Sequence, residues 1–461
     1  MPTTRSFSNC SGNCWRMRRN KCSLKSEACG WKVKKLQEEI AQAVDQFLSG
    51  LKLAPIGPDE LLDSGAEEQL FRDLGRRAVL ARLRERWQAA DPEPERYCPQ
   101  CGSPRTELGV RGRTVRTISG VMELCRRVTY CPRCQVTDAA LDRRLGLEQG
   151  GVTPALARVL TRTSLEVAYD PGKALLTDVL GFTPCSAREM ERIAKHHGQR
   201  VEAAAFSVPS IGCPHPVKRA AHYCIAIDGV MIPGLPNPQT HRLDWHEVKA
   251  AVVFTPSGLR STAYLAALDQ VERFGLRLWN FLQSRGLDQQ DFLQVLGDGA
   301  PWIWNLADLH LPGVPQLLDF YHVAEHLHAT AKSLWTEERA GSWVHERLDQ
   351  LQTGRLGSFF ASLRRLPPDA SAGEAEASPQ RLLEYFLKNR RRLDYRSALR
   401  KNLPIGSGVV ESAGRHIVQL RLKQSGMRWS PNGAQAILNL RTLHRSGDFE
   451  QYWEDHVQAS A

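Results

Sequence analysis

The sequence lacks a long apolar run, and this absence excludes one class of protein. No stretch approaches the roughly 20 apolar residues that a membrane-spanning helix needs. The N-terminal stretch Met1–Cys22 is basic and has no apolar core, so it does not have the form of a secretory signal. We therefore expect a protein of the reducing cytosol, where the twelve cysteines serve as metal ligands or buried thiols rather than as disulfides.

The sequence does have length and an excess of positive charge. Its 461 residues are too many for one compact core, so we expect about two to four domains. Hydrophobic residues make up 42% and charged residues 24%, which is ordinary for a globular chain. The net charge of +11 and the pI near 9.2 are not ordinary. They favour a polyanionic partner, nucleic acid before membrane.

Two C-x-x-C knuckles of the same form are separated by 29 residues. Zinc prefers four soft ligands in a tetrahedron, and the intervening sequence, with a turn at Ser119-Gly120, predicts a hairpin that brings the knuckles together. A redox pair or four incidental thiols would not require two matching knuckles. The sequence therefore predicts one structural zinc, held by Cys98, Cys101, Cys131 and Cys134. The region also carries seven Arg against two Glu, which favours contact with DNA phosphates, although a purely structural ribbon stays open.

Apolar runs alternate with helical patterns from about Ala221 onward, which indicates one α/β sheet. The predicted strands are Tyr223–Met231, Glu247–Phe254, Thr262–Leu268, Phe292–Gly297 and Gln316–Phe320.

Two of the apolar runs end in the dipeptide Asp-Gly, at Asp228 and at Asp298. A carboxylate just past a buried strand is held rigidly yet faces solvent, and two on neighbouring strands can share divalent cations. An isolated Asp-Gly is usually only a turn, but its recurrence within one sheet favours a site. A third carboxylate, Glu411, is predicted one turn into a helix, where an acid can also simply complement the helix dipole. Three oxygen ligands suit Mg²⁺, and two such ions promote in-line phosphoryl displacement.

Together these motifs resemble those of DDE transposases with an RNase H-like core, and more closely those of the ISKra-type family of bacterial insertion sequences. The resemblance covers roughly residues 60–445, and the first 30 residues have no counterpart in it. Besides the two knuckles, the matching features are Asp228-Gly, Asp298-Gly-Ala-Pro-Trp-Ile-Trp-Asn305, Asp319-Phe-Tyr-His322-x-x-Glu325-His326, Gly406-Ser-Gly-x-x-Glu411 and Arg421-Leu-Lys423-x-x-Gly426-Met427-x-Trp429.

The resemblance implies a transposase that binds the ends of an insertion sequence and catalyses strand cleavage and strand transfer. Asp228, Asp298 and Glu411 are then the catalytic triad, holding two Mg²⁺ or Mn²⁺ ions. The implied partners are double-stranded DNA, at the transposon ends and the target, and further copies of the chain, as a homodimer or higher oligomer on DNA. The implied location is the bacterial cytoplasm, at the nucleoid, with no membrane partner.

The implied fold is a multidomain α/β chain. A zinc ribbon and a helical DNA-binding region precede an RNase H-like mixed five-stranded sheet with helices and a helical insertion. The predicted segments are a disordered basic leader (1–34), a helical N-terminal region (35–95), the zinc ribbon (96–148), a helical region resembling a helix-turn-helix (149–215), the two parts of the catalytic core (216–325 and 402–445) with the insertion between them (326–401), and a C-terminal tail (446–461).

Asp319 and His322 sit at the end of the last predicted strand and match a C/D-x-x-H feature of Mutator-like transposases. The resemblance implies that they hold the active-site geometry or contact DNA. A buried pair that caps a helix is an equally good interpretation.

The charge of the chain is concentrated near Glu411. The segment Lys388–Arg428 contains eleven Lys and Arg against two acids, a local net charge of +9. Such a run is commonly a solvated face, but here phosphate neutralisation is favoured. The predicted DNA contacts are Arg415, Arg421, Lys423 and Arg428. Earlier in the chain, Lys173–Arg192 resembles a helix-turn-helix, with Gly181 at the turn and Ser186 capping the second helix.

Two other functions compete with a transposase. His322-Val-Ala-Glu325-His326 fits the H-x-x-E-H motif of inverted zinc peptidases, but that function would leave the two Asp-Gly strands, the knuckles and the charge unexplained. The other is a catalytically inactive DNA-binding protein derived from a transposase, which keeps the zinc ribbon and the helix-turn-helix.

Overall fold

The computed structural model describes residues 63–460, except 149, 207–221, 257, 368–377 and 407. It also describes isolated positions between 38 and 50. The chain divides into two compact units, Met1–Arg72 and Asp73–Ala461. The predicted leader, residues 1–34, lies outside the described residues. Within the described part, no helix has the length and apolar character required to cross a bilayer.

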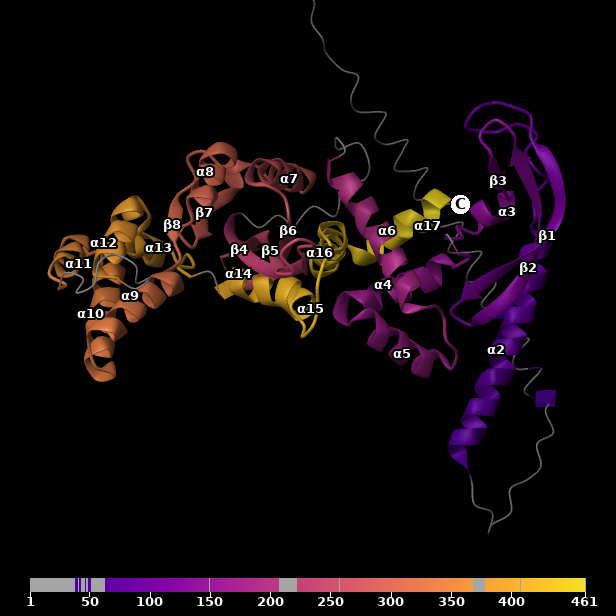
Figure 1. Cartoon of the computed structure of the whole chain (residues 1–461), viewed down its shortest axis with the longest axis horizontal. Coiled ribbons are helices and arrows are strands. Elements are labelled where there is room, and N and C mark those ends of the chain that lie inside the picture. Colours follow the sequence, from indigo (N-terminus) through magenta and orange to yellow (C-terminus); the bar gives the residue numbers. More distant parts are fainter. Residues whose placement is uncertain are drawn as a thin grey trace, which may run out of the picture. The chain divides into compact units, whose positions relative to one another are not determined.

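The two cysteine knuckles lie beside the first sheet of the second unit, which Figure 1 shows, and Cys131 is the last residue of its second strand. The strands of this sheet are β1 (Thr106–Thr117), β2 (Gly120–Cys131) and β3 (Val136–Asp138), all antiparallel. The predicted hairpin is confirmed, because Thr117 pairs with Gly120 across a two-residue turn, and Gly120 has a φ of +139° that suits glycine. A small core of Val115, Met122, Leu124 and Leu141 fixes the sheet against α2 (Ser64–Ala89) and α3 (Ala140–Arg144).

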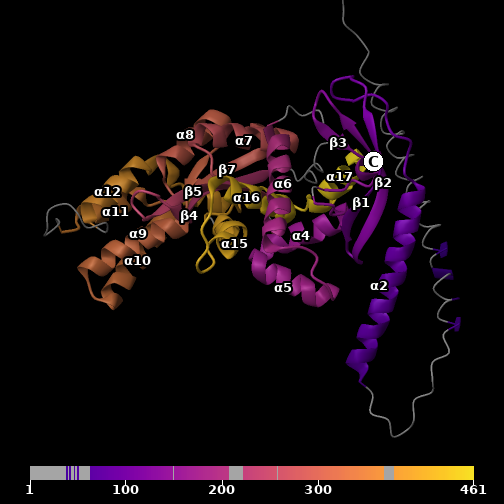
Figure 2. The same cartoon turned by 45° about the vertical axis from the view of Figure 1, so that its right-hand side comes forward.

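Three helices follow, α4 (Pro154–Glu166), α5 (Tyr169–Leu180) and α6 (Ala187–Phe206). Helix α5 ends at Gly181, whose φ of +71° is left-handed, and the Ser186 hydroxyl accepts a 3.2 Å hydrogen bond from the Glu189 N–H at the start of α6. The turn and the cap that the sequence predicts are therefore present. Helix α16 (Pro431–Arg445) packs along α6, as Figures 1 and 2 show.

The second sheet has five strands in the order β6-β5-β4-β7-β8 and is mixed. Strand β5 runs antiparallel to both of its neighbours, β4 and β6, whereas β7 and β8 run parallel to β4. The five predicted strands are confirmed, with different ends for four of them. Their bounds are β4 (Tyr223–Pro236), β5 (Leu243–Thr255), β6 (Gly258–Ala267), β7 (Phe292–Gly297) and β8 (Gln316–Leu318).

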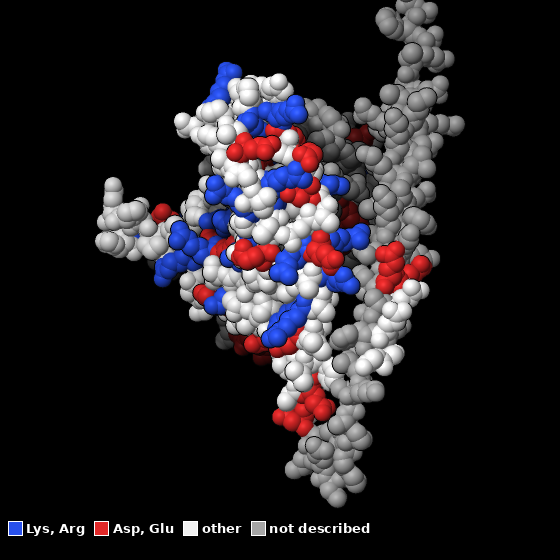
Figure 3. All heavy atoms as spheres, turned by 90° about the vertical axis from the view of Figure 1, so that its right-hand side faces the viewer, with Lys and Arg blue, Asp and Glu red and all other residues white. Residues whose placement is uncertain are grey.

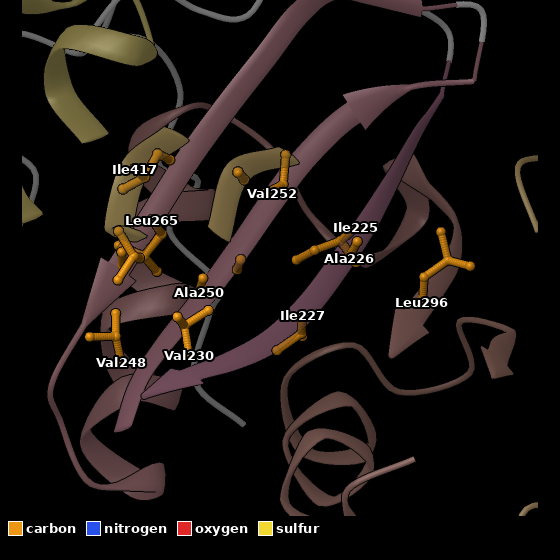
Figure 4. Packing of buried hydrophobic residues seen from close by; sticks show 14 of the residues in the cluster. Ile225, Ala226, Ile227, Val230, Val248, Ala250, Val252, Leu265, Leu296 and Ile417 are labelled. Carbon is orange, nitrogen blue, oxygen red and sulfur yellow. The ribbon is translucent and has the colours of Figure 1, made fainter. Parts of the chain in front are cut away.

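Buried apolar side chains from β4 to β7 form the main core together with Ile417 (Figure 4). Helices α7 (Val271–Ser284) and α8 (Pro301–His310) connect β6 to β7 and β7 to β8. The helices after β8 are α9 (Phe320–Leu334), α10 (Glu337–Gln352), α11 (Leu356–Arg364), α12 (Pro379–Lys388) and α13 (Tyr395–Arg400). The chain then returns to the sheet with α14 (Gly408–Ala413), the π-helix η3 (Gly414–Gln419), α15 (Leu420–Leu422), α16 and α17 (Phe449–Ser460).

Candidate metal centres

Three aspartates stand side by side where the parallel pairing of the sheet ends. Ile227 of β4 pairs with Gly297 of β7, which pairs with Leu318 of β8. Each of these residues is followed directly by an aspartate, and the three are Asp228, Asp298 and Asp319. The sheet therefore brings together two predicted catalytic carboxylates and one predicted positioning residue.

Asp228 was expected at the end of an apolar run, just past a buried strand, although the predicted strand Tyr223–Met231 continues beyond it. The structure agrees with the predicted strand, because Asp228 lies within β4, opposite Ala250 of β5. Strand β4 continues because its other edge stays hydrogen-bonded to β5 as far as Pro236. Its parallel pairing with β7, in contrast, ends at Ile227. The edge of β4 at Asp228 is therefore unpaired on the side of Asp298.

Burial and neighbouring charge disfavour the ionised form of Asp228. Its pKa is raised to about 6, first by burial and further by the carboxylates of Asp298 and Asp319, while a hydrogen bond from the Gly229 N–H and the charge of His322 oppose the shift. The Gly229 N–H lies 2.7 Å from Asp228 Oδ1. A carboxylate held in this environment favours a nearby cation, because a cation removes the repulsion among the three acids.

The main chain and the helices after β8 hold Asp298 in place. Its Oδ1 accepts a 2.9 Å hydrogen bond from the Ala300 N–H, and its carbonyl oxygen accepts one of 2.7 Å from the hydroxyl of Tyr385 in α12. Gly299 has a φ of +105°, and a Cβ at this position would lie 2.8 Å from the Tyr385 ring. Glycine is therefore required here both by the backbone and by the approach of Tyr385.

Asp319 is a buried helix cap that also faces the site. It is 0% exposed, and its Oδ1 accepts hydrogen bonds of 2.6 and 3.1 Å from the N–H groups of Tyr321 and His322, at the start of α9. The capping interpretation of this residue is therefore confirmed. Its charge nevertheless acts on Asp228, so capping and a role in positioning are compatible.

Glu411 lies in α14, and its side chain is outside the described part of the structure. Helix α14 packs on β4 and β5, and the Cα of Gly414, one turn later, faces Val230 of β4. Helix α14 directly precedes the π-helix η3, a wide turn of the kind found at functional sites. The described backbone thus places α14 against the same sheet that carries Asp228.

The four predicted zinc ligands form one cluster. Their sulfur atoms all lie within 4.8 Å of one another, with 3.5 Å between Cys101 and Cys131 and 3.9 Å between Cys98 and Cys134. Zn–S bonds of about 2.3 Å in a tetrahedron place sulfurs about 3.8 Å apart, so this cluster can hold zinc. Without a cation the thiols share protons. Hydrogen bonding by Ser103 lowers the pKa of Cys101 to about 6, and hydrogen bonding with Cys101 raises that of Cys134 to about 12.

Most arginines of the ribbon are already paired with carboxylates. Five of the seven between Cys98 and Cys134 form ion pairs, for example Arg105 with Asp138 and Arg126 with Asp142. The face in Figure 3 likewise shows Lys and Arg side chains interspersed with Asp and Glu. These pairs support the structural interpretation of the ribbon over an arginine-rich phosphate contact.

Most of the cations in the basic segment Lys388–Arg428 are exposed. Nine of its eleven cations are exposed, and none of these nine forms an ion pair with a residue that the structure describes. Three of the four predicted DNA contacts, Arg415, Lys423 and Arg428, belong to this exposed set.

Arg421 requires a correction. It was predicted to contact DNA, but it is 0% exposed, and its guanidinium lies 5.2 Å from the ring of Tyr169 and 5.0 Å from that of Trp429. Its Nε donates to the carbonyl of Ser164 at 2.8 Å. Arg421 is a core residue that joins α15 to α4, and phosphate cannot reach it in this arrangement.

The H-x-x-E-H motif lies on α9, with His322 Nδ1 3.2 Å from Glu325 Oε2 and the His326 ring 4.3 Å from that of Tyr385. Among the described residues, neither His322 nor His326 belongs to a group of three or more His, Cys, Asp or Glu whose ligand atoms lie within 4.8 Å of one another. Among the same described residues Asp228, Asp298 and Asp319 do not form such a group either, so this criterion does not separate the zinc-peptidase function from the transposase function.

One such group was missed by the sequence analysis. It consists of Glu148, His197 and His456. These residues are far apart in the chain, so no spacing signal marks them.

Comparison with known proteins adds little. No family model matches the chain. A stretch of 157 residues is 32% identical to a protein named Ecdysone-inducible protein E75 from Manduca sexta, covering 32% of this chain and 20% of that protein. The chain thus spans only about a fifth of the length of this curated relative. A match of that extent does not assign the chain to a family.

Proposed function

We propose that this chain is a DDE transposase of the ISKra type that cleaves and joins DNA by two-metal phosphoryl transfer. The observation that carries the proposal is the adjacency of Asp228 and Asp298 at the point where β4 and β7 stop pairing. The sheet supports it as well, because three antiparallel strands followed by two parallel ones in the order β6-β5-β4-β7-β8 agree with an RNase H-like core.

The side chains at this edge suit Mg²⁺ or Mn²⁺. They are hard oxygen donors, and the pKa of Asp228 is raised first by burial and further by the carboxylates of Asp298 and Asp319. In the proposal Asp228, Asp298 and Glu411 bind two ions, which activate the attacking oxygen and stabilise the leaving one. Asp319 and Tyr385 orient this edge through the hydrogen bonds described above.

The partner in this proposal is double-stranded DNA, at the transposon ends and at the target, with the protein acting as a homodimer or higher oligomer at the bacterial nucleoid. The exposed cations around Arg415, Lys423 and Arg428 would neutralise phosphates, and α5 and α6 would bind the ends as a helix-turn-helix. The structural zinc at the four cysteines stiffens the ribbon. An inactive DNA-binding derivative is the alternative, and it predicts end binding without cleavage.

The test uses the full chain and a plasmid carrying the DNA that flanks its gene. Asp298→Asn and Glu411→Gln should abolish Mg²⁺-dependent strand cleavage while leaving gel-shift binding nearly unchanged. Asp244→Asn, the same substitution at an exposed position of β5, is the matched control and should cleave normally. Cleavage by Asp298→Asn at the wild-type rate would refute the proposed triad. Binding without cleavage by the wild-type chain would favour the inactive derivative.

A further inference from the structure

Three segments that are distant in the sequence converge on one carboxylate. Glu148 lies between α3 and α4, His197 in α6 and His456 in α17. The Nε2 atom of His456 is 3.0 Å from Glu148 Oε1, and that of His197 is 3.4 Å from the same oxygen. Both imidazoles are buried, at 0% exposure for His197 and 5% for His456.

The ring of His197 is oriented as a metal ligand would be. Its Nδ1 lies 2.8 Å from the hydroxyl of Tyr452, a contact that fixes the ring. Its Nε2 is buried and has no hydrogen-bond partner among the described residues, although it faces Glu148. Histidines that bind metals through one nitrogen characteristically donate the other N–H to an oxygen, which is the part that Tyr452 can play.

We propose that Glu148, His197 and His456 bind a second zinc ion, separate from that of the four cysteines. Tetrahedral zinc with Zn–N and Zn–O bonds of about 2.0–2.1 Å places its ligand atoms about 3.3 Å apart, close to the separations seen here. Imidazole and carboxylate together suit zinc rather than Mg²⁺. The fourth position is available to water or to His196, whose Nε2 is 3.6 Å from Glu148 Oε2.

This ion has a structural role. Its ligands come from the end of the ribbon region, from α6 and from the C-terminal helix α17, so the ion holds these three segments together. Apart from the ion, the packing of these segments depends on Tyr452 and Trp453. The inference does not depend on transposase activity, because the three ligands lie outside the carboxylate edge of the second sheet.

A hydrogen-bonded cluster without metal is the competing explanation, and Glu148→Gln separates the two. Glutamine has nearly the same shape, and its oxygen still accepts the hydrogen bond from His456. It lacks the charge that a zinc ligand needs, so it preserves a hydrogen-bonded cluster and weakens a metal site.

The experiment measures the zinc content of the full chain after purification without chelators. We expect about two zinc ions per chain in the wild type and about one in Glu148→Gln and in His456→Ala. His328→Ala, an exposed histidine of α9, is the control and should retain both. Cobalt substitution identifies the site that is lost. The Glu148→Gln protein should keep the thiolate-to-cobalt absorption of the four-cysteine site and lose only weak visible bands.

The proposal is overturned if the wild-type chain binds a single zinc that disappears in Cys98→Ser, with Glu148→Gln equal to the wild type. If His456→Ala does not fold, the Glu148→Gln protein still decides the question. Equal zinc content and equal stabilisation by added zinc, in Glu148→Gln and the wild type, would show a hydrogen-bonded cluster only.

Discussion

The hydroxyl of Tyr385 donates a 2.7 Å hydrogen bond to the main-chain oxygen of Asp298. This bond joins α12, which lies between β8 and α14 in the chain, to the residue after β7. A second tyrosine, Tyr395, donates to the carbonyl of Leu318 at 2.9 Å, just before Asp319. The helices after β8 therefore support the ends of both parallel strands, and the position of Asp298 depends on them.

Tyr385→Phe should impair catalysis more than folding. Loss of one hydrogen bond should cost about 1 kcal/mol of unfolding free energy. If Asp298 binds a metal, freeing its backbone should also lower the cleavage rate by about tenfold or more. Tyr395→Phe is the matched control, since it removes a similar bond one strand away. Equal losses of stability and of cleavage in the two variants would show that Tyr385 is only a structural support.

Asp228→Asn should stabilise the metal-free protein near neutral pH. Burial raises the pKa of Asp228 to about 6 from an ordinary value of 3.8, so the folded state favours its protonated form. That contribution to stability is complete below pH 3.8 and is lost as pH rises through about 6. Above pH 6, asparagine should therefore gain about 2–3 kcal/mol over aspartate, and near pH 4 little.

Chemical denaturation at pH 4 and pH 7.5 in EDTA measures this difference. Added Mg²⁺ should stabilise the wild type at pH 7.5, because ligand binding favours the folded state, and should not stabilise Asp228→Asn. A variant with the same stability as the wild type at both pH values would contradict the environment described for this carboxylate.

The sequence predicted the parts of the fold that depend on local pattern. The five strands, the hairpin at Ser119-Gly120 and the cap at Ser186 are signalled by alternation and by turn residues, and each is present. The knuckles predicted a cluster because ligand spacing is local within each pair.

Tertiary contacts decided the rest. Arg421 has the same local signal as Lys423, two positions away, yet the first is buried between aromatic rings and the second is exposed. The type of a side chain determines its charge, whereas its burial depends on the fold around it. The cluster of Glu148, His197 and His456 spans most of the chain, and only the packing of α17 brings its members together.

Cys101→Ser should release zinc and unfold the ribbon, because a four-thiolate site contributes folding energy directly. We expect loss of one zinc and new proteolytic cleavage between residues 96 and 148, with the second sheet intact. Cys125→Ser is the control, since Cys125 is exposed on β2 and outside the cluster. Protease resistance of metal-free Cys101→Ser equal to that of the wild type would show that the ribbon folds without metal.

Lys423 and Arg421 should give opposite results on substitution. Lys423→Gln combined with Arg428→Gln removes two exposed cations, so binding to all DNA sequences should weaken alike. The slope of log K against log salt should fall by about 1.8, at about 0.9 for each lost phosphate contact. Arg421→Met should instead destabilise the fold by about 2–4 kcal/mol, because it removes a buried cation and its hydrogen bond to Ser164. Its salt slope should equal that of the wild type under conditions where the protein is folded.

An unchanged slope for the double variant would show that these cations face solvent only. A change in which terminal sequence is bound would show that they contact bases.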